Sequence, residues 1–178
     1  MKLELANHDA EMLHTKLKEF DFKGDIDPIE LTDSMFEIMK NNSGLGLSAN
    51  QVGINARVFV MGLLETRIDV FNPQILNYMG SDGMLDEGCL SYPGIFMRMK
   101  RPSSIHVKFQ DKKGNFKEEV FYGMTARVFL HEYDHLEGIT FKDRVSKMKW
   151  DLATRRMVKN LKRKIINDNT LGIANSYS

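Results

Sequence analysis

The segment His131-Glu132-Tyr133-Asp134-His135 carries the most informative chemistry in this chain of 178 residues. On a helix, His131 and His135 lie four positions apart on one face, so that their imidazoles can share one divalent metal ion. Glu132 lies one position round, where a carboxylate reaches a water beside the metal without binding the metal itself. The segment therefore predicts a metal that activates water to hydrolyse an amide-type bond.

The helix that carries this segment is expected from about Thr125 to Glu137, with Gly138 at the position after the last turn that favours glycine. Around it the apolar pattern and the turn residues predict short strands, over residues 57–61, 68–72, 105–109 and 116–122. Strands and helices do not alternate strictly along the chain. We therefore expect an α+β fold in which antiparallel strands surround a central metal-binding helix.

Three further helical segments are expected. Asp27 is a suitable N-cap, Pro28 a suitable first residue and Glu30 a capping-box partner for a helix that ends near Asn41. Residues 9–20 also place apolar side chains at helical spacing. Residues 146–166 predict a basic amphipathic helix, whose docking face consists of Trp150, Ala153, Met157, Leu161 and Ile165. The length fits one domain over residues 1–166, followed by a flexible tail over residues 167–178.

Charge is distributed unevenly along the chain, although the net charge is only +1. Residues 141–164 contain ten Lys or Arg and two Asp, a net charge of +8, which leaves −7 on the remainder. A basic end on an acidic body indicates an anionic partner for that end. Phosphate contacts there would give salt-sensitive affinity without reading a nucleic-acid sequence.

Catalytic zinc or iron sites usually have three protein ligands and one open position, so a third ligand is needed. No Glu follows Glu137, and position 141 is Phe, which excludes the two common third ligands of His-Glu-x-x-His peptidases. The remaining soft ligand is Cys89, in a polar, glycine-bearing segment. Elimination therefore favours Cys89 as the third ligand.

The single cysteine also bears on location. It rules out an intrachain disulfide, and this composition is typical of a reducing compartment. Residues 1–9 lack the apolar core of a signal peptide, and the longest apolar stretch, residues 58–64, is too short to span a bilayer. We expect a cytoplasmic protein with no membrane partner.

Three motifs in order resemble those of the peptide deformylases, over most of the chain from Ile29 to Trp150. They are Gly44-Leu45-Gly46-Leu47-Ser48-Ala49-Asn50-Gln51, Glu87-Gly88-Cys89-Leu90-Ser91 and His131-Glu132-Tyr133-Asp134-His135-Leu136. The resemblance implies removal of the formyl group from N-formylmethionine at the start of nascent polypeptides, with release of formate. It also implies one metal ion held by Cys89, His131 and His135. Fe²⁺ is the expected native ion, and Zn²⁺, Ni²⁺ or Co²⁺ are alternatives in purified protein.

The resemblance also assigns roles to single residues. Glu132 would carry the proton from water to the leaving amine, while the Gln51 side chain and the Leu90 backbone N–H would stabilise the oxyanion. Gly44 and Gly46 would let the substrate backbone approach closely, and Leu45 and Val128 would contact the methionine side chain. Glu87 would orient a ligand imidazole, and Asp134 would pair with Arg101.

The chain departs from the family pattern at a few positions. Ser48 replaces a usual alanine, and Leu130 replaces a common glutamine before the first histidine. The family often has an arginine seven residues after the metal cysteine, which contacts the substrate backbone. Here that residue is Phe96, and Arg98 is the candidate substitute.

Two alternatives stay open at this level. The chain could be a His-Glu-x-x-His metallopeptidase that cuts internal peptide bonds, although the usual third ligands are absent. It could also be an inactive homologue that binds RNA or the ribosome and keeps a structural metal, although structural zinc usually has four protein ligands. In bacterial deformylases the C-terminal helix can dock on the ribosome, so the basic helix here predicts the same contact.

Overall fold

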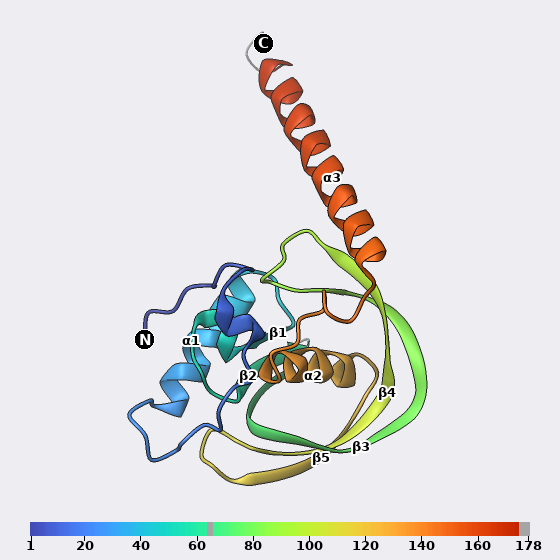
Figure 1. The fold of residues 1–178 in the computed structure, drawn as a ribbon. Helices are drawn as coiled ribbons and strands as arrows, with labels where there is room; N and C mark the ends of the chain where they lie inside the picture. Colours follow the sequence, from blue (N-terminus) through green and yellow to red (C-terminus); the bar gives the residue numbers. More distant parts are fainter. Residues whose placement is uncertain (64–65, 175–178) are drawn as a thin grey trace.

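A computed structural model describes residues 1–63 and 66–174. Figure 1 shows the order of the elements along the chain. The helices are the short 3₁₀ turns η1 and η2 and the α-helices α1, α2 and α3, over Glu11–His14, Ala49–Val52, Pro28–Asn41, Gly123–Leu136 and Lys147–Ala174. The strands β1 to β5 are Gly46–Ser48, Val58–Leu63, Thr66–Gly88, Phe96–Gln110 and Phe116–Tyr122.

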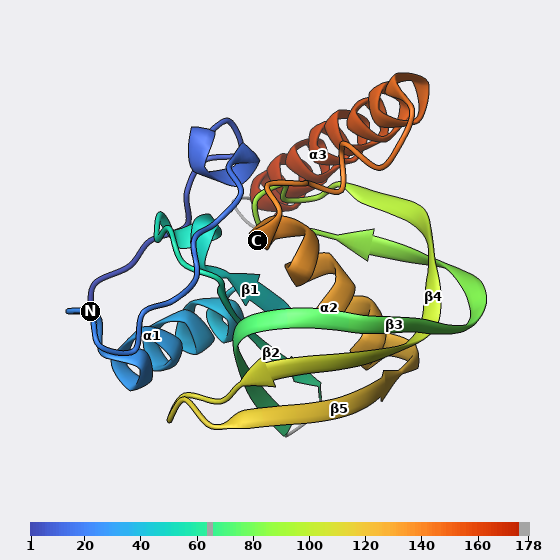
Figure 2. The same cartoon turned by 60° about the horizontal axis from the view of Figure 1, so that its bottom comes forward.

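One antiparallel sheet contains all five strands in the order β1-β2-β3-β4-β5. The pairing of β3 with β4 shifts register at three places, between Phe71 and Gln74, Ile75 and Asn77, and Met79 and Asp82. Such irregularities bend a strand and increase its twist. The sheet accordingly curls around α2, as Figure 2 shows from below. The predicted α+β class, with antiparallel strands around the histidine-bearing helix, is confirmed.

Helix α2 is buried because apolar side chains from the sheet surround it. Phe129 and Leu136 have no exposed surface, and they pack with Phe59, Ile105 and Val107 in one core cluster. Gly138 follows the helix with a φ of +73°, and the amides of Gly138 and Ile139 donate to the carbonyls of His135 and Asp134. The predicted glycine ending is therefore present, and it satisfies the last carbonyls of α2.

Replacing Gly138 by Ala is expected to destabilise the protein by about 2–4 kcal/mol, because two costs add. The left-handed conformation costs about 1–2 kcal/mol for a residue with a Cβ, and the new Cβ would lie 2.8 Å from the carbonyl carbon of Thr15. Gly53 is a matched control, because its φ is +79° but a Cβ there would meet nothing within 4 Å. Urea unfolding of both variants isolates the steric cost, and equal losses would contradict it.

Helix α1 begins as predicted. The Asp27 side chain accepts hydrogen bonds from the backbone N–H groups of Ile29 and Glu30, at 2.8 and 2.9 Å. The predicted capping box is wrong in one respect, because the Glu30 carboxylate pairs with the N-terminal ammonium of Met1. The cap still fixes the start of α1, whose buried face packs on β1 and β2 beside the motif at residues 44–51.

The helix expected over residues 9–20 is also wrong. Only Glu11–His14 forms a single 3₁₀ turn, and the chain then extends past the end of α2, where the Leu17 amide donates to the Leu136 carbonyl. Leu13, Leu17 and Phe20 are nonetheless buried. The spacing of these apolar residues correctly indicated that they contact the core, but here a mostly extended segment makes the contact instead of a helix.

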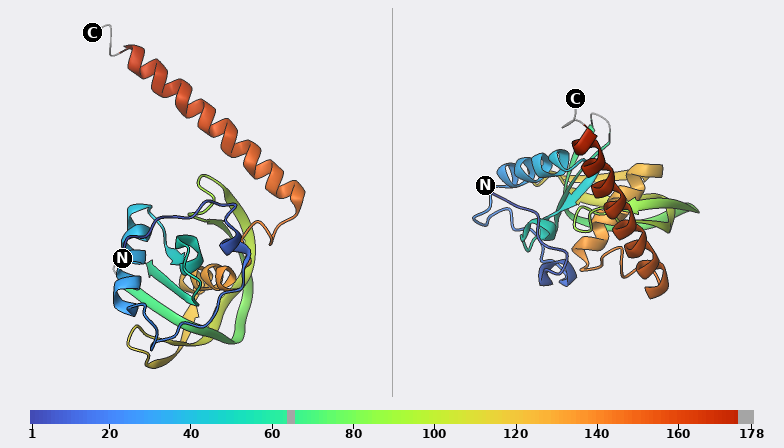
Figure 3. Two further views of the ribbon diagram at one scale, coloured as in Figure 1. Left: turned by 60° about the vertical axis from the view of Figure 1, so that its left-hand side comes forward. Right: turned by 90° about the horizontal axis from the view of Figure 1, so that it is seen from above.

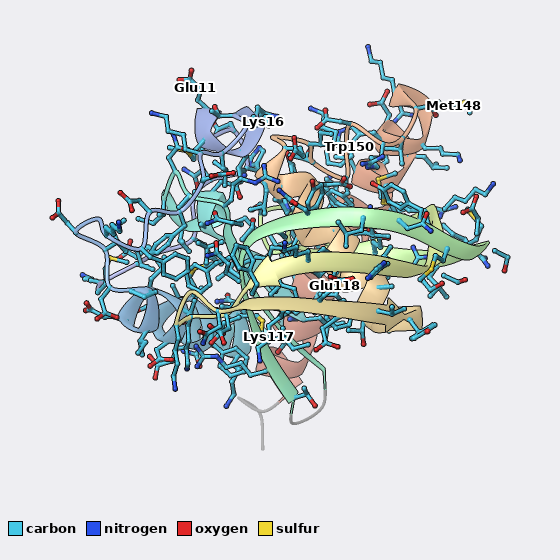
Figure 4. All side chains as sticks on the ribbon, turned by 90° about the horizontal axis from the view of Figure 1, so that it is seen from below. Glu11, Lys16, Lys117, Glu118, Met148 and Trp150 are labelled. Atoms are coloured by element: carbon cyan, nitrogen blue, oxygen red, sulfur yellow. The ribbon has the colours of Figure 1, made fainter. Side chains whose placement is uncertain are left out.

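Helix α3 projects from the body, as Figures 1 and 3 show. Its first turns are anchored, because Trp150, Ala153 and Met157 pack against Tyr92, Phe141 and neighbours in a third core cluster. Figure 4 shows Trp150 at the base of α3 and Met148 pointing outward. The outer part of the predicted docking face, Leu161 and Ile165, does not pack on the body, since both side chains are more than half exposed.

The C-terminal boundary also differs from the prediction. Helix α3 continues to Ala174 instead of ending at residue 166, so the part of the predicted flexible tail over residues 167–174 is helical. The last part of that tail, residues 175–178, lies outside the described residues. Within the described part of the chain, no helix has the length and apolar character needed to cross a bilayer.

Candidate metal centre and active site

Cys89, His131 and His135 come together from the end of β3 and the middle of α2. Their candidate ligand atoms all lie within 4.8 Å of one another, and the Cys89 Sγ lies 3.3 Å from the His135 Nε2. A sulfur and a nitrogen that ligate the same tetrahedral ion lie about 3.6 Å apart. The spacing and the donor set, one thiolate and two imidazoles, therefore fit one transition-metal ion.

Replacing Cys89 by Ser is expected to weaken metal retention by at least about a hundredfold, since losing even a supporting partner of a ligand costs 10–100-fold. Metal content after dialysis against a weak chelator measures this. Cys89 is the only cysteine, so protection of the thiol from alkylation gives a second readout on the native protein. A variant that holds metal as the native protein does would contradict the assignment of Cys89 as a ligand.

Glu87 orients one of the imidazoles, as the sequence predicts. The His131 Nδ1 lies 3.1 Å from the Glu87 Oε2, which leaves the His131 Nε2 for the metal. Arg101 forms two hydrogen bonds to the same carboxylate, at 2.7 and 2.9 Å, and Arg127 adds a third at 2.7 Å. Burial alone would raise the pKa of Glu87, but the hydrogen bonds from His131 and Arg101 outweigh it and hold this pKa at about 2.

Asp134 pairs with Arg101, which bears out the predicted contact. The Arg101 Nη1 lies 2.9 Å from the Asp134 Oδ2, and Arg144 pairs with the same carboxylate from the segment before α3. Arg101 thus links two buried acids, one that holds His131 and one that lies beside His135 in the sequence. The result is a buried ionic network directly behind the metal ligands.

The connection between β1 and β2, a loop that contains η2, brings Gln51 to the centre. The Gln51 Oε1 accepts from the Ser48 backbone N–H at 2.9 Å, which turns the Nε2 toward Ser91 at 3.0 Å and Cys89 Sγ at 3.4 Å. The Asn50 side chain donates to the His135 carbonyl at 2.7 Å and so ties this loop to α2. Three segments that are far apart in the sequence thereby converge.

Glu132 lies beside the ligands with a free acceptor. Its Oε2 is buried without a hydrogen-bond partner among the described residues. Burial raises its pKa to about 7; nearby Glu87 and Asp134 act in the same direction, while His131 and Arg101 oppose them. Desolvated carboxyls of this kind are typical of groups that move protons near neutral pH.

The two glycines of the first motif accommodate the chain's own side chains. A Cβ on Gly46 would overlap the Glu132 carboxylate, with its carbon 2.8 Å away, and a Cβ on Gly44 would lie 2.8 Å from the Leu90 Cδ1. The sequence predicts that these glycines admit the substrate backbone. Within the chain itself, their missing Cβ atoms leave room for Glu132 and Leu90.

A cavity of about 520 Å³ opens onto this centre. Its lining includes Cys89, His131 and Glu132 at the chemistry, together with Gln51 and Leu90. The other predicted substrate-contact residues that line it are Gly44, Leu45, Gly46 and Val128. Three candidate ligands beside a cavity would leave one coordination position open, as a catalytic metal site requires and a structural one does not.

Arg98 does not line this cavity. It borders a separate hollow with Lys100, Arg144 and Lys149. The reason is its place on β4, where Phe96 is the rim residue and Arg98 lies two positions, about 7 Å, further along the strand. The prediction that Arg98 replaces the substrate clamp therefore has no support from the geometry.

The sequence reading missed Arg127 and Arg144. Besides Glu87, Arg127 bonds the carbonyls of Met99 and Gly83 and so fixes β3 and β4 against α2. Its place four residues before His131 on the same helix face is a signal that could have identified it. Arg144 lies in an irregular segment, and no sequence pattern connects it with Asp134.

The fold and the centre together define a metal-dependent hydrolase with a Cys-His-His ligand set. Comparisons with known proteins narrow this class. The family profile of polypeptide deformylases matches residues 2–151. Peptide deformylase of Thermotoga petrophila is 42% identical over 133 residues, which cover 74% of this chain and 81% of the relative. That of Chlorobium luteolum is 43% identical over 157 residues, covering 83% and 80%.

Solved structures agree. The crystal structure of peptide deformylase from Thermotoga maritima superposes with a TM-score of 0.78 at 36% identity, covering 82% of this chain and 99% of that one. The Synechococcus elongatus enzyme, solved in complex with actinonin, gives 0.80 at 32% identity, covering 87% and 85%. The chain belongs to the peptide deformylase family, and it is a hydrolase that acts on formylated nascent peptides in translation. The two alternative functions are not supported.

Proposed function

We propose that Cys89, His131 and His135 hold Fe²⁺ and that this centre removes the formyl group from N-formylmethionine, releasing formate. The observation that carries the assignment is the convergence of three ligand atoms within 4.8 Å beside an open cavity, with the buried Glu132 carboxylate next to them. Fe²⁺ as the native ion follows from the family resemblance, and Zn²⁺, Ni²⁺ or Co²⁺ fit the same donors in purified protein.

A divalent cation held by Cys89, His131 and His135 would lower the pKa of water at this centre and so would supply a nucleophile near neutral pH. Glu132 takes a proton from the attacking water and delivers it to the amine that leaves when the C–N bond breaks. The buried Glu132 Oε2 supports this role, because no group of the described chain donates a hydrogen bond to it and it is free to accept a proton.

Two donors stabilise the negative charge that develops on the formyl oxygen. The Gln51 Nε2 is oriented by the hydrogen bond that its Oε1 accepts from Ser48. The Leu90 backbone N–H follows the ligand Cys89 directly and has no acceptor among the hydrogen bonds of the described residues. Donors that are positioned in advance need no rearrangement as charge develops, which is the main source of such stabilisation.

Apolar contacts hold the methionine side chain. Leu45 and Val128 both line the cavity, Leu45 from the loop before β1 and Val128 from helix α2. Val128 lies about one helical turn before His131. Burying a side chain of this size contributes about 1.5–3 kcal/mol.

Formate release from a formyl-methionyl tripeptide, with metal analysis of the same sample, tests the proposal. We expect turnover by the iron-loaded protein under anaerobic conditions. Parallel samples loaded with Ni²⁺, Co²⁺ or Zn²⁺ rank the ions. A metal-replete protein that releases no formate would overturn the deformylase assignment.

We propose further that α3 docks on the ribosome in the cytoplasm, where nascent chains emerge. The exposed outer part of α3 carries a run of basic residues, and its free length allows contact with ribosomal phosphates. A chain ending at Val158 keeps the packed residues Trp150, Ala153 and Met157 and is the appropriate truncation. We expect full-length binding to ribosomes to fall steeply with salt and the truncated chain to lose it; affinity that ignores both would contradict the proposal.

A further inference from the structure

Three large apolar side chains are exposed on the rim of the catalytic cavity. Phe96, Leu45 and Met124 all line the cavity, and they are 69%, 46% and 43% exposed. They come from three separate elements, the start of β4, the loop before β1 and the start of α2. Such a patch beside a site is a surface for binding, because large exposed apolar side chains gain free energy when a ligand covers them.

Phe96 is held next to the chemistry by a glycine. It pairs with Gly88 across β3 and β4, and a Cβ on Gly88 would lie 2.8 Å from the Phe96 Cε1. The ring therefore lies directly over the backbone of the residue that precedes the ligand Cys89. The same cavity is lined by His131 and Glu132 and by Phe96, so a substrate whose formyl group lies at this centre can extend its following residues past this ring.

The charged side chains that line the cavity are almost all buried, so they add little charge to the apolar rim. Glu87, Arg127, His131 and Glu132 are buried, and among the described residues that line the cavity only Asp86 presents an exposed charge. The Arg127 guanidinium is engaged by Glu87 and two carbonyls. The rim thus offers apolar contact and no cation for the side chains that follow methionine.

We propose that Phe96 is a specificity-determining residue, which makes the enzyme favour nascent chains with a large apolar residue directly after formylmethionine. This inference rests on the proposed deformylase function. The contact is remote from the scissile bond and is made equally before and during the reaction. Its effect therefore falls on KM, while kcat stays nearly unchanged.

The test compares formyl-Met-X-Ala peptides in which X is Phe, Leu, Ser or Asp. For the native enzyme we expect kcat/KM to be about tenfold higher for Phe and Leu than for Ser and Asp, the order that one apolar contact gives. In Phe96→Ala the preference should shrink to about twofold or less, through a rise in KM for the apolar peptides only.

Phe116→Ala is the matched control. Phe116 is 68% exposed on β5, where it contacts Lys108 and lies outside the cavity lining, and its loss should leave the preference intact. Metal content of each variant confirms an equal centre. A native enzyme without the preference, or a Phe96→Ala enzyme that keeps it, would overturn the inference while formate release continues. Failure of every peptide to release formate would instead overturn the proposed function.

Discussion

Replacing Glu132 by Gln is expected to lower kcat for a formyl-methionyl peptide by about 10²–10⁴-fold while metal content stays at the native level. The amide has the size of the carboxylate, so it fits the space left by the missing Cβ of Gly46. It cannot accept and return a proton, and that role contributes 10²–10⁴-fold in typical enzymes. Steady-state formate release and metal analysis on the same preparation measure the two effects separately.

A matched control for this variant is Glu119→Gln, the same chemical change on the exposed face of β5. We expect native turnover from the control. If Glu132→Gln kept a tenth or more of the native kcat with metal bound, proton transfer by Glu132 would be refuted. If it lost metal as well, Glu132 would have to be regarded as a support of the metal centre.

Replacing Arg101 by Met is expected to destabilise the protein by about 3–5 kcal/mol, the usual cost of removing one partner from a buried ionic network. Arg101 is 4% exposed and carries hydrogen bonds to both Glu87 and Asp134. Without it, two buried carboxylates lose a guanidinium. The free energy of unfolding, from urea titration of metal-loaded protein at a fixed free metal concentration, measures the loss.

Lys100→Met is the control on the neighbouring position of β4. Lys100 pairs with Asp82 at the surface, where an ion pair contributes about 0–1 kcal/mol. A loss of less than 1 kcal/mol for Arg101→Met, or equal losses for the two variants, would show that the network does not stabilise the fold. We also expect weaker metal retention in Arg101→Met, because Glu87 would no longer be fixed where it meets His131.

The start of α1 and the end of α2 were predicted correctly from the sequence, because each depends on residues that are close together in the chain. The Asp27 cap and the Gly138 ending depend only on neighbouring backbone groups, and both appear as expected. Only residues 68–72 of the 23-residue strand β3 were predicted, because its later part contains Gly80 and Gly83, and glycine weakens the local signal of a strand. They remain in the strand because β4 pairs along its length, and such long-range pairing leaves no local signal.

The candidate site was also predictable only in part. Ligand chemistry and three motifs identified Cys89, His131, His135 and Glu132, since metal and water chemistry restrict the residue types. Arg127 and Arg144 were missed because an arginine that satisfies a buried acid is chemically ordinary, and only tertiary structure shows which acid it meets. Arg98 was proposed from sequence proximity to Phe96, whereas strand geometry directs it to another hollow.

The anchoring of α3 has a consequence for how that helix forms. An isolated helix has a costly first turn, and further residues then add at little cost. Trp150 and Met157 pack against the third core cluster, which includes Cys89, and these contacts hold the first turns of α3 in place. The body therefore supplies the nucleus from which the 28-residue helix, about 42 Å long, extends outward. Unfolding of the body would remove this nucleus, so we expect the outer turns of α3 to lose helicity together with the body.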